Sequence, residues 1–99
     1  MGDNDDLQIF HGSVHSQIDH SGTGNIYVRQ LTNDRDVIIQ SDDGSGGLAT
    51  YFQLDGSLAD GNNYYTKWPD NSIASFGSAP DLLIYHDGTN SRIRNIATI

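Results

Sequence analysis

Apolar and polar positions alternate with a period of two along most of this chain of 99 residues. Successive side chains of an extended strand point to opposite faces of a sheet, so this alternation predicts short β-strands. No segment has the 3.6-residue period of a helix, and turn-forming residues separate the runs at intervals typical of an all-β protein. The predicted strands span residues 7–10, 14–18, 25–31, 37–40, 48–54, 64–68, 73–76, 82–85 and 91–93.

One segment of the chain is repeated. Residues 6–18 read DLQIFHGSVHSQI, and 75 positions later residues 81–93 read DLLIYHDGTNSRI. Each copy has an apolar alternating run, a turn with glycine and a second alternating run, which is the pattern of a β-hairpin. We therefore predict hairpins over 7–18 and 82–93 that enclose middle strands over 25–76. The whole chain, 1–99, is then a single all-β module with one repeat of about 75 residues and the start of the next.

Several residues are predicted to form turns because of their type. Asp-Gly pairs suit the positive dihedral angles of a two-residue type I′ turn, which makes Asp55-Gly56 and Asp87-Gly88 the best candidates for tight hairpin turns. Two further glycines, Gly12 and Gly44, lie at turns between alternating runs. The predicted turn residues are Gly12, Gly44, Asp55, Gly56, Asp87 and Gly88.

The composition predicts a thin hydrophobic core. Only 35% of the residues are apolar, against roughly 45–50% in an average globular chain. There is no cysteine to form disulfides. In the run LATYFQL both faces carry apolar side chains, so the strand needs cover on two sides. A small chain can hardly cover both sides alone, and we expect strands of neighbouring subunits to complete the core of a homo-oligomer.

The charge narrows the range of partners. The net charge is −8, and all thirteen acidic residues are Asp. The five basic residues form no dense patch in the sequence, which argues against nucleic acid as a partner. No apolar run approaches the roughly 20 residues of a membrane-spanning helix, and the N-terminal MGDNDD is not a signal peptide, so we expect no membrane insertion.

The side-chain chemistry favours structural roles. His11, His15 and His20 lie close together and His86 repeats His11, but their spacing matches no metal motif, and His11, His15 and His86 are only weak metal candidates. The acidic loop SDDGSGG fits no known calcium loop; a plain turn is the favoured interpretation, and an adventitious calcium site is the alternative. No pattern of nucleophile, base or phosphate loop is present. The prediction is therefore no enzymatic activity, no cofactor and no dedicated metal site.

An aromatic cluster lies in the run NYYTKWP. Alternation places Tyr64 and Trp68 on one side and Tyr65 on the other. Flat aromatic rings suit the apolar faces of sugars, so the cluster is a candidate glycan site. Because apolar residues are scarce elsewhere, the interpretation we favour is that at least two of the three rings are buried between subunits.

Four phrases of the sequence are similar to repeated elements of structural proteins in tailed bacteriophages, especially marine and cyanobacterial phages. They are GDNDDLQIFH, SGTGNIYVR, VIIQSDDGSGGLATYFQLDGS and DLLIYHDGTNSRI, and they cover roughly residues 2–95. The first hairpin departs from the pattern, with Gly12-Ser13 where the family has Asp-Gly. The resemblance implies an all-β virion component, commonly trimeric and often intertwined, that is made in the host cytoplasm and displayed on the extracellular particle.

Together these features predict a virion structural protein that assembles by β-pairing between subunits. The first interpretation is a segment of a tail fibre or appendage, a trimer in contact with other virion proteins. Two alternatives stay open: a capsid decoration (cement) protein, and a carbohydrate-binding module that attaches to a host-surface glycan.

Overall fold

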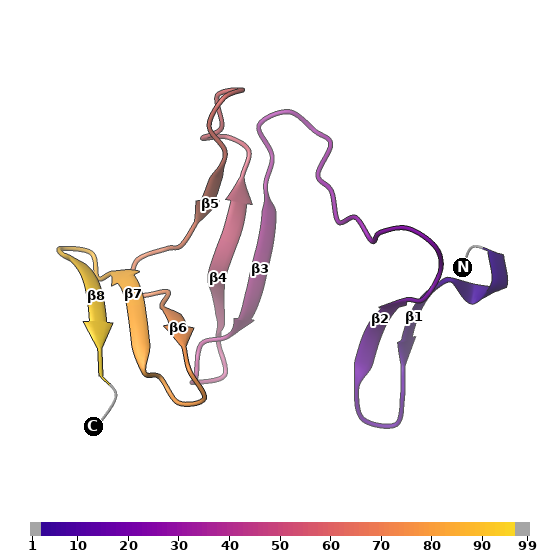
Figure 1. Cartoon of the computed structure of the whole chain (residues 1–99), viewed down its shortest axis with the longest axis horizontal. Coiled ribbons are helices and arrows are strands. Elements are labelled where there is room, and N and C mark those ends of the chain that lie inside the picture. Colours follow the sequence, from indigo (N-terminus) through magenta and orange to yellow (C-terminus); the bar gives the residue numbers. More distant parts are fainter. Residues whose placement is uncertain (1–2, 97–99) are drawn as a thin grey trace.

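The computed structural model describes residues 3–96, and its strands form three small antiparallel sheets (Figure 1). The all-β class is confirmed, since the described chain contains no helix beyond the short 3₁₀ turn η1. The sheets have the strand orders β1-β2, β3-β4-β5 and β6-β7-β8. The elements are η1 (Asp3–Asp5), β1 (Leu7–His11), β2 (Ser16–His20), β3 (Val37–Asp42), β4 (Leu48–Asp55), β5 (Tyr65–Lys67), β6 (Ala74–Phe76), β7 (Leu82–His86) and β8 (Ser91–Asn95).

The two hairpins that repeat in the sequence have the same strand register. In the first, Ile9 lies opposite Ile18 at the centre of β1 and β2. In the second, Ile84 lies opposite Ile93 at the centre of β7 and β8. Every other pair of the first hairpin also has its counterpart 75 positions later. β7 differs from β1 in having a further neighbour, the short strand β6.

The loops of the two hairpins close with equivalent backbone hydrogen bonds. The amide of Gly12 donates to the carbonyl of His15 at 2.7 Å, and the amide of Asp87 donates to the carbonyl of Asn90 at 3.0 Å. Each loop therefore contains four residues. The hairpin predicted at Asp87-Gly88 forms, but its loop is not a two-residue type I′ turn: of the two residues, only Gly88 has a positive φ, of 96°. The Asp87 carboxylate accepts from the amides of the last two loop residues, which stabilises the wider loop.

In the middle sheet, Asp55 and Gly56 lie at a turn, as predicted, but this turn is not the tight connection of a two-residue hairpin. β4 ends at Asp55 and β5 begins only at Tyr65, so the pair starts a long connection. Gly56 has an ordinary φ, but a Cβ at this position would collide with the carbonyl oxygen of Arg35. Glycine is required here because another part of the backbone passes very close to it.

A second irregularity lies inside β4. The partners of β3 shift by one residue between Ile39 and Gln40, which leaves Tyr51 as the extra residue of a β-bulge. Side-chain alternation is broken at a bulge, so the two regular faces predicted for LATYFQL are not maintained along the strand. The Tyr51 hydroxyl donates to the carbonyl of Asp42 at 2.6 Å.

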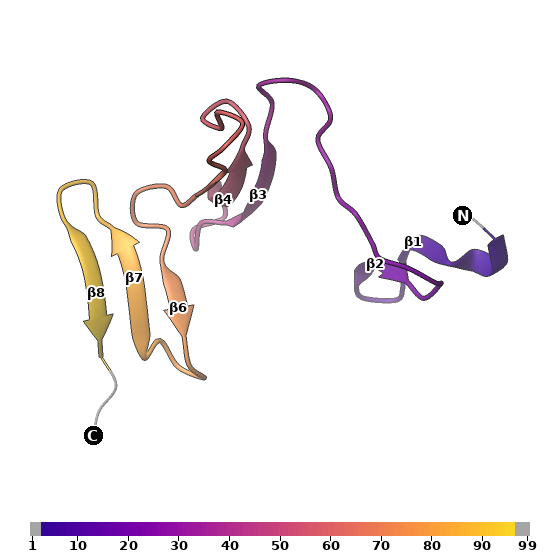
Figure 2. The same ribbon diagram turned by 45° about the horizontal axis from the view of Figure 1, so that its top comes forward.

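The strand predicted over residues 25–31 does not form within this chain. Residues 21–36, here called the connecting segment, run from β2 to β3 without pairing to any strand (Figures 1 and 2). The Arg29 guanidinium carbon lies 5.2 Å from the ring centre of Tyr27, as expected for residues two apart in an extended chain. An alternating run becomes a strand only beside a sheet edge, and the first hairpin stands away from the other sheets in both views.

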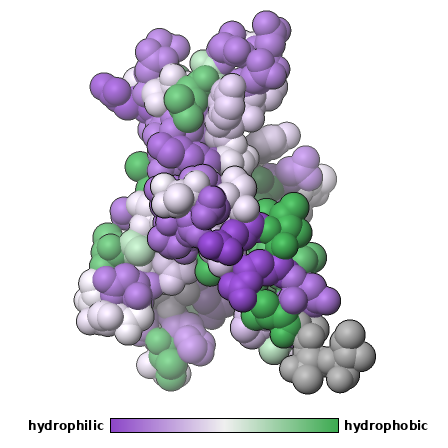
Figure 3. All heavy atoms as spheres, turned by 90° about the vertical axis from the view of Figure 1, so that its left-hand side faces the viewer, coloured by the Kyte–Doolittle hydropathy of each residue, from purple (hydrophilic) through white to green (hydrophobic). Residues whose placement is uncertain are grey.

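A single chain has almost no hydrophobic core. Among the described residues, Leu83 is the one buried apolar side chain, with 7% of its surface exposed. The radius of gyration is 17.6 Å, against about 13 Å for a compact domain of this length. The accessible surface is 8151 Å², whereas a compact monomer of this mass exposes about 5,500 Å², so about 2,600 Å² is in excess. Figure 3 shows hydrophobic side chains at the surface, among hydrophilic ones.

No helix in the part of the chain that the structure describes is long and apolar enough to cross a membrane.

The close approach at Gly56 gives a direct test of the fold. We expect Gly56→Ala to lower the free energy of unfolding by about 1–3 kcal/mol, because the new methyl group and the backbone of Arg35 cannot occupy the same space. Gly12→Ala is the matched control: its Cβ would lie 3.7 Å from the nearest atom, the carbonyl oxygen of His15. It should change stability by less than about 1 kcal/mol. Urea unfolding measures both; equal effects would contradict the placement of the connecting segment.

Candidate functional site

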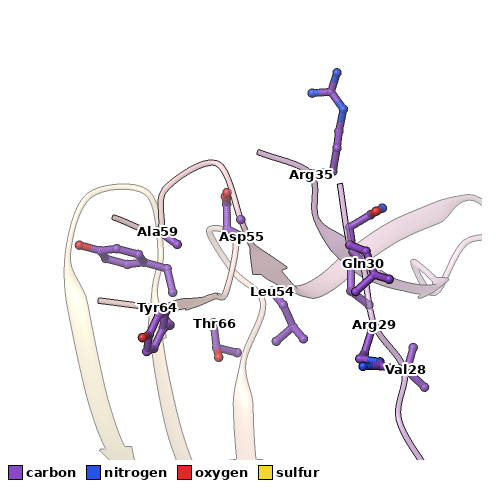
Figure 4. A pocket seen from close by; sticks show the side chains of 13 residues that line it. Val28, Arg29, Gln30, Arg35, Leu54, Asp55, Ala59, Tyr64 and Thr66 are labelled. Atoms are coloured by element: carbon purple, nitrogen blue, oxygen red, sulfur yellow. The ribbon is translucent and has the colours of Figure 1, made fainter. Parts of the chain in front are cut away.

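An open groove of about 440 Å³ lies between the connecting segment and the β4–β5 region (Figure 4). One wall comes from Val28 to Leu31, and the other from the end of β4, the following loop and the start of β5. Most of the lining is apolar, with a few polar side chains among it. In Figure 4 the Arg35 side chain extends away from the other labelled side chains. One wall of the groove is therefore an unpaired segment, and the other belongs to an ordered sheet.

Asp36 anchors the connecting segment to this sheet. One carboxylate oxygen of Asp36 accepts a hydrogen bond from the side-chain amide of Gln53 at 2.9 Å, and the other accepts from the backbone amide of Gly56, also at 2.9 Å. These two bonds determine where the chain crosses Gly56. Arg35 and Gly56 both line the groove, so the anchor lies beside it.

Asp55 is the buried carboxylate at the groove. Its residue is 5% exposed, and it accepts from the Ser57 hydroxyl at 2.6 Å and from the Ser57 and Leu58 amides, both at 3.1 Å. The Lys67 ammonium lies 3.7 Å away. The hydrogen bond from the Ser57 hydroxyl, together with the amide donors and Lys67, holds the pKa of Asp55 below its ordinary value in spite of burial.

This environment gives Asp55 a structural role. Several donors point at its two oxygens, so the carboxylate is held in its ionised form and has little capacity left to accept a proton. A general acid or base would need a raised pKa and an open path to a substrate atom. Asp55 instead fixes the start of the loop that forms one wall of the groove.

The three predicted aromatic residues are not all brought together. Tyr64 and Tyr65 line the groove, while Trp68 stacks on Phe52, with ring centres 5.2 Å apart and an angle of 24° between the planes. Tyr64 lies before the first residue of β5, so the alternation of side chains along that strand does not apply to it. All three rings are exposed in the single chain, Tyr64 the most at 80%.

The histidines lie at the ends of the hairpins. His11 Nδ1 lies 2.9 Å from the hydroxyl oxygen of Ser16, and His86 Nδ1 lies 3.1 Å from that of Ser91. Each bond joins the last residue of one strand to the first of the next. His15 lies in the loop of the first hairpin. Within residues 3–96, no three histidines or carboxylates are grouped closely enough to hold a metal ion.

The acidic loop between β3 and β4 uses its carboxylates to close turns. Asp42 accepts from the amides of Gly44 at 2.8 Å and Gly46 at 3.0 Å. Asp43 accepts from the amides of Ser45 at 2.8 Å and Gly47 at 3.1 Å. Gly44 has a φ of 92°, a left-handed conformation that glycine adopts readily. The carboxylate oxygens are thus used by the backbone of their own loop.

Sequence reasoning did not find the anchor at Asp36. Its partners Gln53 and Gly56 lie 17 and 20 positions away, and no local pattern links carboxylates to such distant donors. The glycine at position 56 was the one available signal, because glycine is often found where another part of the backbone approaches closely.

No protein-family model matches the sequence, and neither a curated protein nor a solved structure is similar enough to count as a match. The geometry of the chain and its sequence therefore carry the functional argument.

The turn carboxylates predict how stability depends on pH. Asp55, Asp60 and Asp87 all have pKa values below the ordinary value of 3.8, and Asp87 lies well below it because of the Asn90 amide and the Arg92 side chain. An unfolded chain therefore binds more protons below about pH 4, so the stability that these groups contribute above that pH is lost as the pH falls through their lowered pKa values. Thermal midpoints should stay nearly level from about pH 6 to about pH 4 and decrease from there down to pH 2.

A matched pair of variants tests whether Asp87 contributes to this dependence of the thermal midpoint on pH. Asp87→Asn should reduce the slope of midpoint against pH, because the native carboxylate no longer titrates. Asp19→Asn, which removes a carboxylate from an exposed position of the first hairpin, is the matched control. Equal slopes for both variants would show that Asp87 is not coupled to folding.

Proposed function

We propose that this chain is a structural subunit of a bacteriophage virion, a segment of a tail fibre or related appendage that assembles with copies of itself. Its activity is to build and display, without chemical turnover. Assembly proceeds through β-pairing and apolar packing between chains. A trimer is the oligomer that the resemblance to phage proteins favours.

The observation that carries this proposal is the uncovered apolar surface. The total accessible surface of the chain exceeds that of a compact monomer by about 2,600 Å², which is comparable with the area that obligate homo-oligomers bury. Side chains that would normally lie in a core are largely in water, among them Leu31 at 81%, Val28 at 74% and Leu48 at 69%. Contact with other chains is the simplest way to cover them.

Open sheet edges support the same proposal. β3 and β5 are edges of the middle sheet, and β6 and β8 are edges of the C-terminal sheet. Unpaired edges bind other strands readily, and natural proteins cover or block them. The connecting segment, extended and alternating but unpaired, has the pattern of a strand that adds to such an edge in another copy.

The repeated hairpins support an arrangement in layers. Equal register and equal loop bonds, 75 residues apart, are expected when one unit is stacked along an axis. The virion context itself is supported by the resemblance to repeated elements of tailed-phage proteins. A capsid decoration protein would share these features, and binding to empty capsids would identify it.

The first prediction of this proposal concerns mass and shape. Light scattering should give a constant multiple of the chain mass, 10.8 kDa, over a wide concentration range, because the contacts between chains replace the core. Small-angle X-ray scattering should give an elongated particle. A stable monomer at all concentrations would contradict the proposal, since the exposed apolar side chains would then have no partner.

Carbohydrate binding is a second candidate function, and the groove favours it. Tyr64 and Tyr65 border an open cavity that also has Arg29, Gln30 and Thr66 on its walls. Aromatic faces beside hydrogen-bonding side chains are a typical way to hold a sugar ring. This function is compatible with a fibre that attaches to a host-surface glycan.

The glycan candidate predicts a specific mutational pattern. Tyr64→Ala should weaken a saturable signal on a glycan array by about tenfold, because the most exposed ring at the groove is lost. Trp68→Ala is the control: Trp68 stacks on Phe52 outside the groove, so the variant should keep the signal. Loss of the signal in both variants would point to a folding defect, and no signal in wild type would exclude this candidate.

A further inference from the structure

The register of the two hairpins assigns their side chains to two faces. Residues directly opposite each other across an antiparallel pair lie on the same face. The first face, here called the shared face, comprises Leu7, Ile9, His11, Ser16, Ile18 and His20 in the first hairpin, and Leu82, Ile84, His86, Ser91, Ile93 and Asn95 in the second. The opposite face comprises Gln8, Phe10, Gln17 and Asp19, and Leu83, Tyr85, Arg92 and Arg94.

Within the paired strands, the identity between the hairpins is confined to the shared face. Five of its six positions carry the same residue in both copies, and the sixth changes only from His20 to Asn95. On the opposite face none of the four positions is identical, and Asp19 is replaced by the cation Arg94. The shared face is therefore nearly identical in the two hairpins, whereas the opposite face differs between them.

The shared face has apolar side chains at its centre, carries no Asp, Lys or Arg, and is open to water in the single chain. Ile9 and Ile18 are 62% and 67% exposed, and their counterparts Ile84 and Ile93 are 44% and 78% exposed. The absence of Asp on this face is notable in a chain with a charge of −8. Two copies of such a chain can approach closely only where no like charges meet.

We propose, resting on the oligomeric subunit proposed above, that the shared face is the surface through which copies of this chain meet. Each hairpin packs its shared face against the same hairpin of a neighbouring copy, around a common axis. The Ile pairs form the centre of the contact, and the His-Ser pairs at the loop end form its polar rim.

The partner is a second copy because of the duplication itself. A partner that contacts both hairpins in the same way must present two equivalent surfaces with matching spacing. A second copy of this chain carries the same two hairpins and therefore has two such surfaces at the same spacing. Closed rotational symmetry is the usual arrangement of homo-oligomers, and residues near the axis then contact their own equivalents. The excess area of a single chain leaves ample surface for such contacts.

The chain has no cysteine, which allows a clean cross-linking test. Single cysteines are introduced on the shared face as Ile18→Cys or Ile93→Cys, and on the opposite face one position away as Gln17→Cys or Arg92→Cys. The variants, each with all 99 residues of the chain, are treated with a short bis-maleimide at low protein concentration. Light scattering of each variant before treatment checks its assembly, and denaturing gels measure covalent dimer.

We expect several-fold more covalent dimer from Ile18→Cys and Ile93→Cys than from Gln17→Cys and Arg92→Cys. If a shared-face cysteine instead lowers the mass while its opposite-face control keeps it, the same contact is supported. If the variants are oligomeric but the opposite-face cysteines cross-link, or only a mixture of Ile18→Cys with Ile93→Cys does, this inference is overturned and the proposed function stands. A wild-type monomer would overturn the proposed function itself.

Discussion

The apolar surface that a single chain leaves in water is the quantity on which the rest of the structure depends. One buried apolar side chain, Leu83, cannot hold 94 described residues in place, because burial of apolar area is the main term that offsets the loss of conformational entropy on folding. The three sheets approach one another only slightly, and the first hairpin stands apart (Figures 1 and 2). A chain of this kind is ordered locally by hydrogen bonds, and in the assembly proposed above the larger stabilising term comes from contacts with other chains.

The local order accounts for the use of Asp at the turns. A carboxylate on a single methylene reaches backbone amides two to four residues further on, and the longer side chain of Glu does this less well. Asp60 shows the pattern: it accepts from the amides of Asn62 at 3.0 Å and Asn63 at 2.7 Å. The same geometry recurs at Asp42 and Asp87. Part of the net charge of −8 is therefore a consequence of how the turns are closed.

Alternation predicted most strands because each strand of these sheets has a local two-residue period. Three features of the structure could not be predicted from the alternation. The bulge at Tyr51 adds one residue to a strand without any change in composition. The anchor between Asp36 and Gln53 joins residues that no local pattern connects. Residues 25–31 have a strand pattern but no sheet edge beside them, and pairing depends on the partner as much as on the sequence.

A comparison of the two hairpins shows which positions stay free of Asp, Lys and Arg and which positions carry them. A surface buried between copies excludes unpaired charge, since removing a charge from water is costly without a partner. The shared face meets this requirement in both hairpins, with Ile and His at matching positions. The opposite face carries Asp19 in one hairpin and Arg92 with Arg94 in the other, a change that only water or different neighbours would accept. In the proposed assembly the constant face therefore meets the same surroundings at both levels, while the variable face is free to adapt to whatever lies outside.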